Sequence, residues 1–196
     1  LIDLKGMRKI FSQRRSEFWV SLITALMVVF VGVEQGILLA IVLSLIDHTR
    51  RGYRPKNAVL VPAESGVWRA QPVATKAQAI PGLLIYRFTH SMYYANSQQL
   101  SEEILDLVNS AEPPLRWFCL DAAAVDDVDY TAAETLRSLF GILKEKGIRL
   151  VVAQILDDLK AESRYHLSQL FGEDAFYETL GDVMKAYRQQ MGMEAK

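Results

Sequence analysis

The stretch that decides the fold runs from Phe18 to Ile46 and reads FWVSLITALMVVFVGVEQGILLAIVLSLI, with Glu34 as its only ionisable residue. An apolar run of this length is typical of a segment in lipid, because a soluble core rarely needs one. Its centre reads GVEQG over residues 32–36. Two glycines, a carboxylate and an amide are unfavourable in the middle of one continuous membrane span.

Basic residues flank both ends of this run. They are Lys5, Arg8, Lys9, Arg14 and Arg15 before it, and His48, Arg50, Arg51, Arg54 and Lys56 after it. Lys and Arg beside membrane segments favour the cytoplasmic side, so we expect both ends in the cytoplasm and an even number of crossings. We predict a transmembrane helical hairpin with arms over residues 18–31 and 37–46 and a turn at Gly32, Glu34 and Gly36. One tilted helix over the whole run is the alternative.

The two predicted arms are short for a membrane. At ~1.5 Å per residue they are about 15–20 Å long, against a hydrocarbon core of ~30 Å. Because turn backbone is not stable in bare lipid, we expect other protein segments around the turn. Glu34 could bind a proton or steer an anion pathway there, or it could lie in water or beside a neighbour at the hairpin apex. The chain starts at Leu1 rather than Met, and we interpret it as the C-terminal part of a longer protein.

Charge divides the chain into a basic and an acidic part. Residues 1–56 carry nine Lys/Arg and four Asp/Glu, a net charge of +5, whereas residues 57–196 carry thirteen and nineteen, a net charge of −6. Neither part is typical of a nucleic-acid binder. The predicted order is a basic amphipathic lead-in at 1–17, the hairpin at 18–46, a basic linker at 47–56 and a soluble domain at 57–196. The lead-in is either an interfacial helix or a solvated linker.

The pattern after residue 56 predicts an α/β domain. We expect short strands at 57–62 and 67–72, core strands at 83–88, 116–120 and 148–153, and helices at 96–108, 131–146, 158–171 and 179–190. Near-continuous apolar strands between amphipathic helices are typical of a mostly parallel sheet covered by helices, here with the first two strands as an edge hairpin. Asn96 and Thr131 are predicted to open helices as capping boxes, and Gly147 to end one.

A cluster of acids precedes the helix predicted at 131–146. It consists of Asp121, Asp126, Asp127 and Asp129. These carboxylates could hold a metal or shape a phosphorylation site, or they could simply be the acids that turns and helix N-termini favour. No second cluster of His, Cys or acids supports a metal centre, so we predict no metal. Thr131 is either a regulatory phosphoacceptor beside free backbone N–H groups or a plain helix cap.

Other chemistry-bearing residues give no catalytic set. Met92, Tyr93 and Tyr94 line a ligand groove or pack over the sheet edge. The three histidines lie at no recognisable spacing from a Ser or Cys, and the phosphate-binding glycine motifs are absent from the sequence. The sequence therefore predicts neither an enzyme nor a cofactor.

Two parts of the chain resemble one family of membrane proteins. Residues 16–40 resemble the last two membrane helices of SulP (sulfate permease) anion transporters, and the remainder resembles their STAS domain (sulfate transporter and anti-sigma factor antagonist). The resemblance to STAS rests on YAN at 94–96, LDAAAV at 120–125 and DYTAAETL at 129–136. It implies a multi-pass protein of the inner or plasma membrane, commonly a homodimer, with a cytoplasmic STAS domain of mostly parallel sheet covered by helices.

The resemblance also implies a function. The chain would be the C-terminal fragment of a secondary-active, sulfate-type inorganic anion transporter, whose STAS domain regulates transport, dimer assembly or the binding of a kinase or regulatory protein. Thr131 stands where anti-sigma antagonists have a phosphorylated Ser, although Tyr130 and Ala132 replace the small residues of their motif. The substrate site is expected on earlier helices, so this fragment holds no substrate-binding residue. A membrane-tethered STAS signalling module is the alternative, and about twelve further apolar spans upstream would distinguish the transporter.

Overall fold

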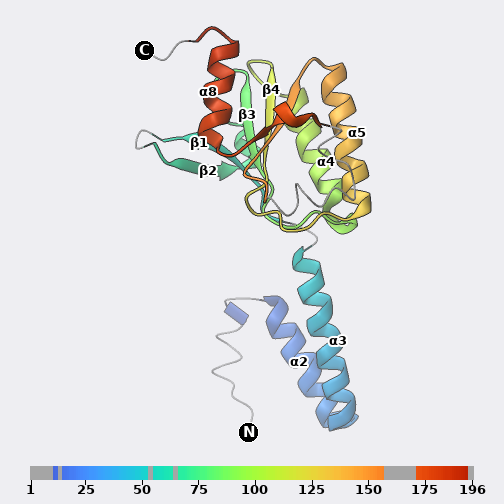
Figure 1. Ribbon diagram of the computed structural model, residues 1–196. Coiled ribbons are helices and arrows are strands. Elements are labelled where there is room, and N and C mark those ends of the chain that lie inside the picture. The colour runs from blue at the N-terminus through green and yellow to red at the C-terminus, as the bar shows by residue number, and fades with distance from the viewer. Residues whose placement is uncertain (1–10, 13–14, 53–54, 64–65, 157–170, 194–196) are drawn as a thin grey trace. The chain divides into compact units, whose positions relative to one another are not determined.

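The computed structural model describes residues 11–12, 15–52, 55–63, 66–156 and 171–193. The chain forms two compact units, Leu1–Tyr53 and Arg54–Lys196 (Figure 1). Most of the predicted lead-in at 1–17 and nearly all of the helix predicted at 158–171 lie outside the described residues. The domain boundary predicted after residue 56 stays a prediction.

The first unit is a helical hairpin. Helix α2 (Arg15–Phe30) and helix α3 (Val33–Gly52) are joined by Val31 and Gly32 (Figure 1). Gly32 has a φ of +149°, and its N–H donates to the carbonyl of Met27 at 3.1 Å, which closes α2. The alternative of one continuous helix over residues 18–46 is therefore wrong.

The turn predicted over residues 32–36 is too wide, because only Gly32 of its three named residues lies in the turn. Glu34 belongs to the first turn of α3, where the helix dipole favours a carboxylate. Gly36 is buried against α2, and a Cβ built on it would lie 2.2 Å from Val28 Cγ2. The absent side chain of Gly36 thus serves close helix packing rather than a turn. Helix α3 also runs on to Gly52 through part of the predicted linker, since no proline interrupts it before that point.

Most apolar side chains of the hairpin are exposed, with Phe30 80% and Val29 73% accessible. The other exposed large apolar residues are Trp19, Ile23, Leu26, Val31, Val33, Ile37, Leu38, Ile41, Val42, Leu45 and Ile46. Within the described part of the chain, no helix combines the length and apolar character needed to cross a membrane.

The second unit contains a six-stranded mixed sheet. Its strands are β1 (Ala58–Pro62), β2 (Trp68–Pro72), β3 (Leu83–Arg87), β4 (Trp117–Asp121), β5 (Arg149–Ala153) and β6 (Phe176–Tyr177). The order is β2-β1-β3-β4-β5-β6, with β3 to β6 parallel and the β1–β2 hairpin antiparallel at one edge. The predicted mostly parallel sheet with an edge hairpin is confirmed. Strand β6 was not predicted, because two residues carry no periodicity.

Helices cover both faces of this sheet. Helices α4 (Tyr94–Asn109) and α5 (Tyr130–Glu145) lie side by side on one face, and α8 (Leu180–Gln190) lies on the other (Figure 1). Two short 3₁₀ turns, η1 (Val73–Thr75) and η3 (Glu173–Ala175), complete the described elements. Alternate residues of the central strands enter the two cores: Leu84, Tyr86 and Phe118 face α4 and α5, whereas Leu83, Ile85 and Trp117 face α8. The central strands are consequently buried on both faces.

The start of α4 differs from its prediction, whereas the end of α5 confirms one. Helix α4 begins two residues before Asn96, so Asn96 is not the cap; its Oδ1 instead accepts the N–H of the cap residue Tyr93 at 2.9 Å. Gly147 directly follows Lys146, the C-cap residue of α5, and has a φ of +71°, as predicted for a glycine that ends a helix in the left-handed conformation.

Candidate regulatory surface at the carboxyl ends of the parallel strands

Two loops meet where β3 and β4 end. The loop after β3 and the loop after β4 are tied by backbone bonds, since Met92 N–H donates to the Asp127 carbonyl at 2.8 Å and Asp129 N–H donates to the Met92 carbonyl at 2.9 Å. Open α/β sheets bind ligands at the carboxyl ends of their strands. The predicted acid cluster and the Tyr93–Tyr94 pair therefore share the edge of the sheet where a functional site is expected.

Asp129 joins the two helices that begin at this edge. Its Oδ1 accepts the N–H of Ala132 at 2.8 Å and so caps α5, and its Oδ2 accepts the N–H of Tyr94 at 2.7 Å, the first residue of α4. A carboxylate is favourable here because both helix N-termini carry partial positive charge. One side chain thus fixes the start of α5 against the start of α4.

Asp121 lies apart from the other acids, on the face of the sheet that carries α8. Its side chain is fully buried and pairs with Arg87 of the neighbouring strand, with 2.6 Å between Nε and Oδ2. Its Oδ1 accepts the N–H of Ala123 at 3.1 Å, which shapes the turn after β4. Because Asp121 is buried and already paired with a cation, we assign it a structural role at the ends of β3 and β4.

Asp126 and Asp127 are exposed. Asp126 accepts a hydrogen bond from the buried Ser91 hydroxyl, and this bond lowers the pKa of the Asp126 carboxyl more than partial desolvation raises it. Asp127 accepts the N–H of Val128 at 2.9 Å and contributes its carbonyl to the link with Met92. These contacts hold the loop after β4 against the loop after β3.

The structure does not bring the four acids together around one point. In the part of the chain that the structure describes, no three His, Cys, Asp or Glu side chains could hold a metal ion. Asp129 instead satisfies helix N-termini and Asp121 pairs with Arg87. The acids thus have the places that the turn-and-helix interpretation of the cluster predicts.

Thr131 lies in the first turn of α5 and its side chain is exposed, but the predicted cap at Thr131 is wrong. Asp129 stands two residues earlier and reaches the N–H of Ala132, which leaves Thr131 inside the helix. Two tyrosines at the starts of α4 and α5 are also exposed, Tyr94 to 72% and Tyr130 to 66%. Met92, by contrast, is buried in the core, so it lines no groove.

Sequence reasoning missed two residues of this surface. Arg87 lies within the apolar run LLIYRF, and a charge in a buried strand is itself a signal that a partner exists. Ser91 carried no such signal, because its partner Asp126 lies 35 residues away in the chain.

These features define the class: a small α/β domain with an exposed surface at the start of two helices, without a catalytic set among its described residues. Residues 74–183 match the model of the STAS domain, and the chain belongs to the STAS family. The motifs that indicated STAS lie in β4 and its loop and in the first turns of α4 and α5.

The relatives of the whole chain are transporters. A probable sulfate transporter of Mycobacterium tuberculosis strain H37Rv is 32% identical over 193 residues, which cover 97% of this chain and 34% of that protein. High affinity sulfate transporter 2 of Stylosanthes hamata is 26% identical over 201 residues, which cover 95% of this chain and 30% of that protein. This chain therefore spans about a third of the length of these relatives.

A solved structure shows the same fold. The murine Solute Carrier 26 family member A9 anion transporter, in its inward-facing state, matches 95% of this chain and 31% of its own with a TM-score of 0.76 at 14% identity. Together these findings confirm the resemblance to the STAS region of SulP-type transporters.

Proposed function

We propose that the chain is the C-terminal part of a secondary-active transporter of sulfate or a similar inorganic anion. One observation carries this proposal: the likeness to sulfate transporters extends over 97% of the chain and thus includes the helical hairpin as well as the STAS domain. A STAS protein without a membrane part would share the second unit alone.

The hairpin supports a place in a membrane. Each of its two helices exposes a row of large apolar side chains, a surface that lipid or further apolar helices would cover. Basic residues precede and follow it in the sequence, which supports both ends in the cytoplasm. In this proposal the protein is multi-pass, α2 and α3 pack among its other membrane helices, and the STAS domain is cytoplasmic.

The STAS domain would regulate transport, homodimer assembly or the binding of a kinase or regulatory protein, with Thr131 as phosphoacceptor. Two observations support Thr131: its side chain is exposed, and it stands in the first turn of α5, where a phosphate is favoured by the helix dipole. Asp129 supplies the cap, so modification of Thr131 need not disturb the start of the helix.

Uptake by the purified full-length protein in liposomes tests the proposal. We expect radiolabelled sulfate to accumulate above empty liposomes and to be displaced by unlabelled sulfate. Thr131→Glu and Thr131→Ala should then differ in uptake rate at equal protein, and mass spectrometry should find phosphate on Thr131 in cells. Absence of uptake for sulfate, bicarbonate, chloride and dicarboxylates would favour the membrane-tethered signalling module.

A further inference from the structure

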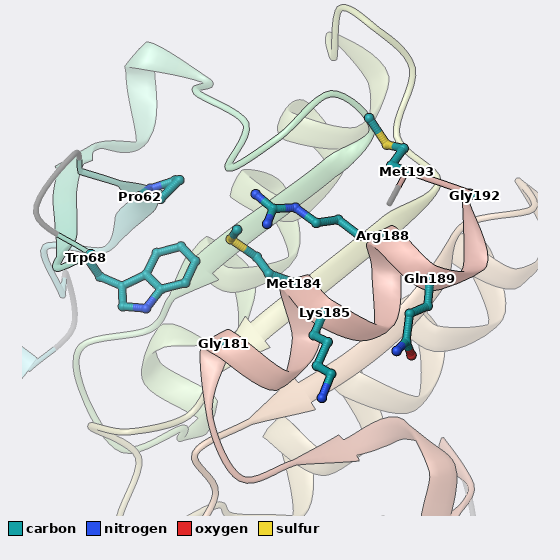
Figure 2. A pocket seen from close by; sticks show the side chains of 10 residues that line it. Pro62, Trp68, Gly181, Met184, Lys185, Arg188, Gln189, Gly192 and Met193 are labelled. Carbon is teal, nitrogen blue, oxygen red and sulfur yellow. The ribbon is translucent and has the colours of Figure 1, made fainter. Parts of the chain in front are cut away.

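A groove runs between α8 and the β1–β2 hairpin, away from the surface around Thr131. Its volume is about 660 Å³. The groove is lined by Pro62, Gly66 and Trp68 of the β1–β2 hairpin and by Gly181, Met184, Lys185, Arg188, Gln189, Gly192 and Met193 of α8 and the residues after it. Figure 2 labels all of these residues except Gly66. The residues from α8 follow helical spacing, so one stripe of this helix forms a whole wall of the groove.

The floor and walls of the groove are mainly apolar. Trp68, Pro62 and Met184 come together with the guanidinium of Arg188, whereas Lys185 and Gln189 point away from the hairpin (Figure 2). Trp68 and Met184 are half-buried, and Met193 is 46% exposed. Aromatic, methionine and arginine side chains are the residues that protein interfaces favour, so this surface has the composition of a binding site.

Arg188, like Arg69 and Arg116, has no carboxylate partner among the described residues of the domain. By contrast, Arg87 pairs with Asp121 and Arg149 with Asp174. Among the described residues, the groove is lined by the basic residues Lys185 and Arg188 and by no acidic one, although residues 57–196 carry a net charge of −6; of the two, Arg188 is the one that extends toward the β1–β2 hairpin (Figure 2). The charge of the groove is thus opposite to that of its domain, and it is complementary to an anionic partner.

The shape of the groove suits a helix. On the opposite face of the sheet, α4 and α5 lie side by side, whereas α8 packs against β4, β5 and β6 and leaves the surface above the β1–β2 hairpin beside it (Figure 1). The lining residues within α8 run from Gly181 to Gln189 and extend along about 12 Å, at ~1.5 Å per residue, which matches about two turns of a second helix.

We propose that this groove binds an acidic amphipathic helix of a partner protein. Apolar residues of that helix would pack on Trp68 and Met184, and one of its carboxylates would pair with Arg188. The proposal concerns binding by the STAS domain and requires no transport, so its failure would leave the proposed transport function untouched.

Fluorescence anisotropy tests the proposal with the whole chain in nanodiscs of zwitterionic lipid. The probe is a labelled 18-residue helical peptide with Leu and Met on one face and Glu on the other, and empty nanodiscs give the background. We expect saturable binding to the wild-type chain and binding at least about tenfold weaker to Arg188→Glu, because the substitution replaces attraction by repulsion. The matched control is Lys144→Glu, which makes the same charge change at an exposed position of α5, on the opposite face of the sheet.

Four results would overturn the proposal. They are absence of peptide binding to the wild-type chain, equal loss of binding in Lys144→Glu, unchanged binding in Arg188→Glu, and equally tight binding of a peptide in which Lys replaces every Glu. Mass photometry of the same samples measures whether two copies of the chain associate. A dimer in the wild-type chain that becomes a monomer in Arg188→Glu would assign the groove to a second copy of this chain and would also overturn the proposal. Circular dichroism of each variant confirms that the exposed substitutions leave the fold intact.

Discussion

Asp129 performs two tasks because its two oxygens face two different helices. Oδ1 caps α5 and Oδ2 holds the first N–H of α4, so this carboxylate links segments that are 35 residues apart. Thr131, two residues later, has the residue type of a cap but lies inside the helix. The structure therefore predicts a large loss of stability when Asp129 is replaced and a small one when Thr131 is replaced.

The stability of variants at Asp129 and Thr131 shows which of the two residues caps α5. Asp129→Ala should lower the free energy of unfolding by about 2–3 kcal/mol, since one cap and one hydrogen bond to a charged acceptor are lost. Thr131→Ala should change it by less than about 0.5 kcal/mol, because an exposed helix position tolerates Ala. Urea unfolding in a fixed detergent, followed by near-ultraviolet circular dichroism, measures both. A larger cost for Thr131→Ala than for Asp129→Ala would return the cap to Thr131.

A second prediction at this scale concerns pH. The Ser91 hydroxyl donates to Asp126 and lowers the pKa of that carboxyl, so the stabilisation is present above the ordinary pKa of Asp and is lost as pH falls through the lowered one. Ser91→Ala should raise the pKa of Asp126, which ¹³C NMR titration of the labelled carboxyl measures. His90→Ala should raise it less, because the charge of His90 is the smaller cause. An equal pKa in wild type and Ser91→Ala would contradict the role of Ser91.

From the sequence, the places of these residues in turns and helix starts were easier to predict than their hydrogen-bond partners. Acids before a helix were expected at a turn and an N-terminus, and Asp129 lies there. Asp129 and Thr131 are both good cap residues, so local sequence alone could not decide between them. The bonds from Asp129 to Tyr94 and from Ser91 to Asp126 depend on the pairing of β3 with β4, which no local pattern contains.

Elements with strong periodicity were predictable, and the weak ones were not. Strands β3, β4 and β5 are continuous apolar runs, and α5 has an apolar stripe and a terminal Gly147, so each was expected within a few residues. Strand β6 has only two residues and depends on its bonds to β5. The end of α3 was also missed, because charged residues after Ile46 mark the end of the apolar run rather than the end of a helix.

The contact between α2 and α3 gives a prediction at the scale of elements. A Cβ at position 36 would lie 2.2 Å from Val28 Cγ2 and 3.3 Å from Val28 Cα, and Val28 is stiff because it is β-branched. Gly36→Leu should separate the two helices. Gly36→Ala combined with Val28→Ala should keep the wild-type spacing, because Val28→Ala removes the Cγ2 that the new Cβ would meet. Spin labels on cysteines placed at the exposed positions 21 and 44 measure this spacing by double electron–electron resonance.

The native cysteine does not interfere with this measurement. Cys119 is fully buried in β4, and burial raises the pKa of its thiol, so it stays protonated and unreactive toward the label. The control is Gly141→Leu, at a helix position in α5 where a Cβ meets no atom within 4 Å. An unchanged distance distribution in Gly36→Leu would show that the close approach at Val28 is not needed.

The whole molecule combines two units with opposite physical character. The hairpin exposes its apolar side chains, whereas the STAS domain buries a core on each face of its sheet and has a net charge of −6 over residues 57–196. Because this domain has its own two-sided core and a charge far from zero, we predict that it folds alone and remains soluble.

The place where that domain starts is the last prediction. The buried residue Pro55 accepts a hydrogen bond from Gln99 Nε2 of α4 at 3.1 Å, so the residues before β1 contribute to the domain. A fragment of residues 54–196 should unfold cooperatively, and a fragment of 57–196 should also fold but be about 1 kcal/mol less stable, because this bond and the burial of Pro55 are lost. Urea unfolding of both fragments, followed by circular dichroism, measures the difference. Gln99→Ala should remove most of that difference from the longer fragment, and a disordered longer fragment would show that the domain requires the hairpin to fold.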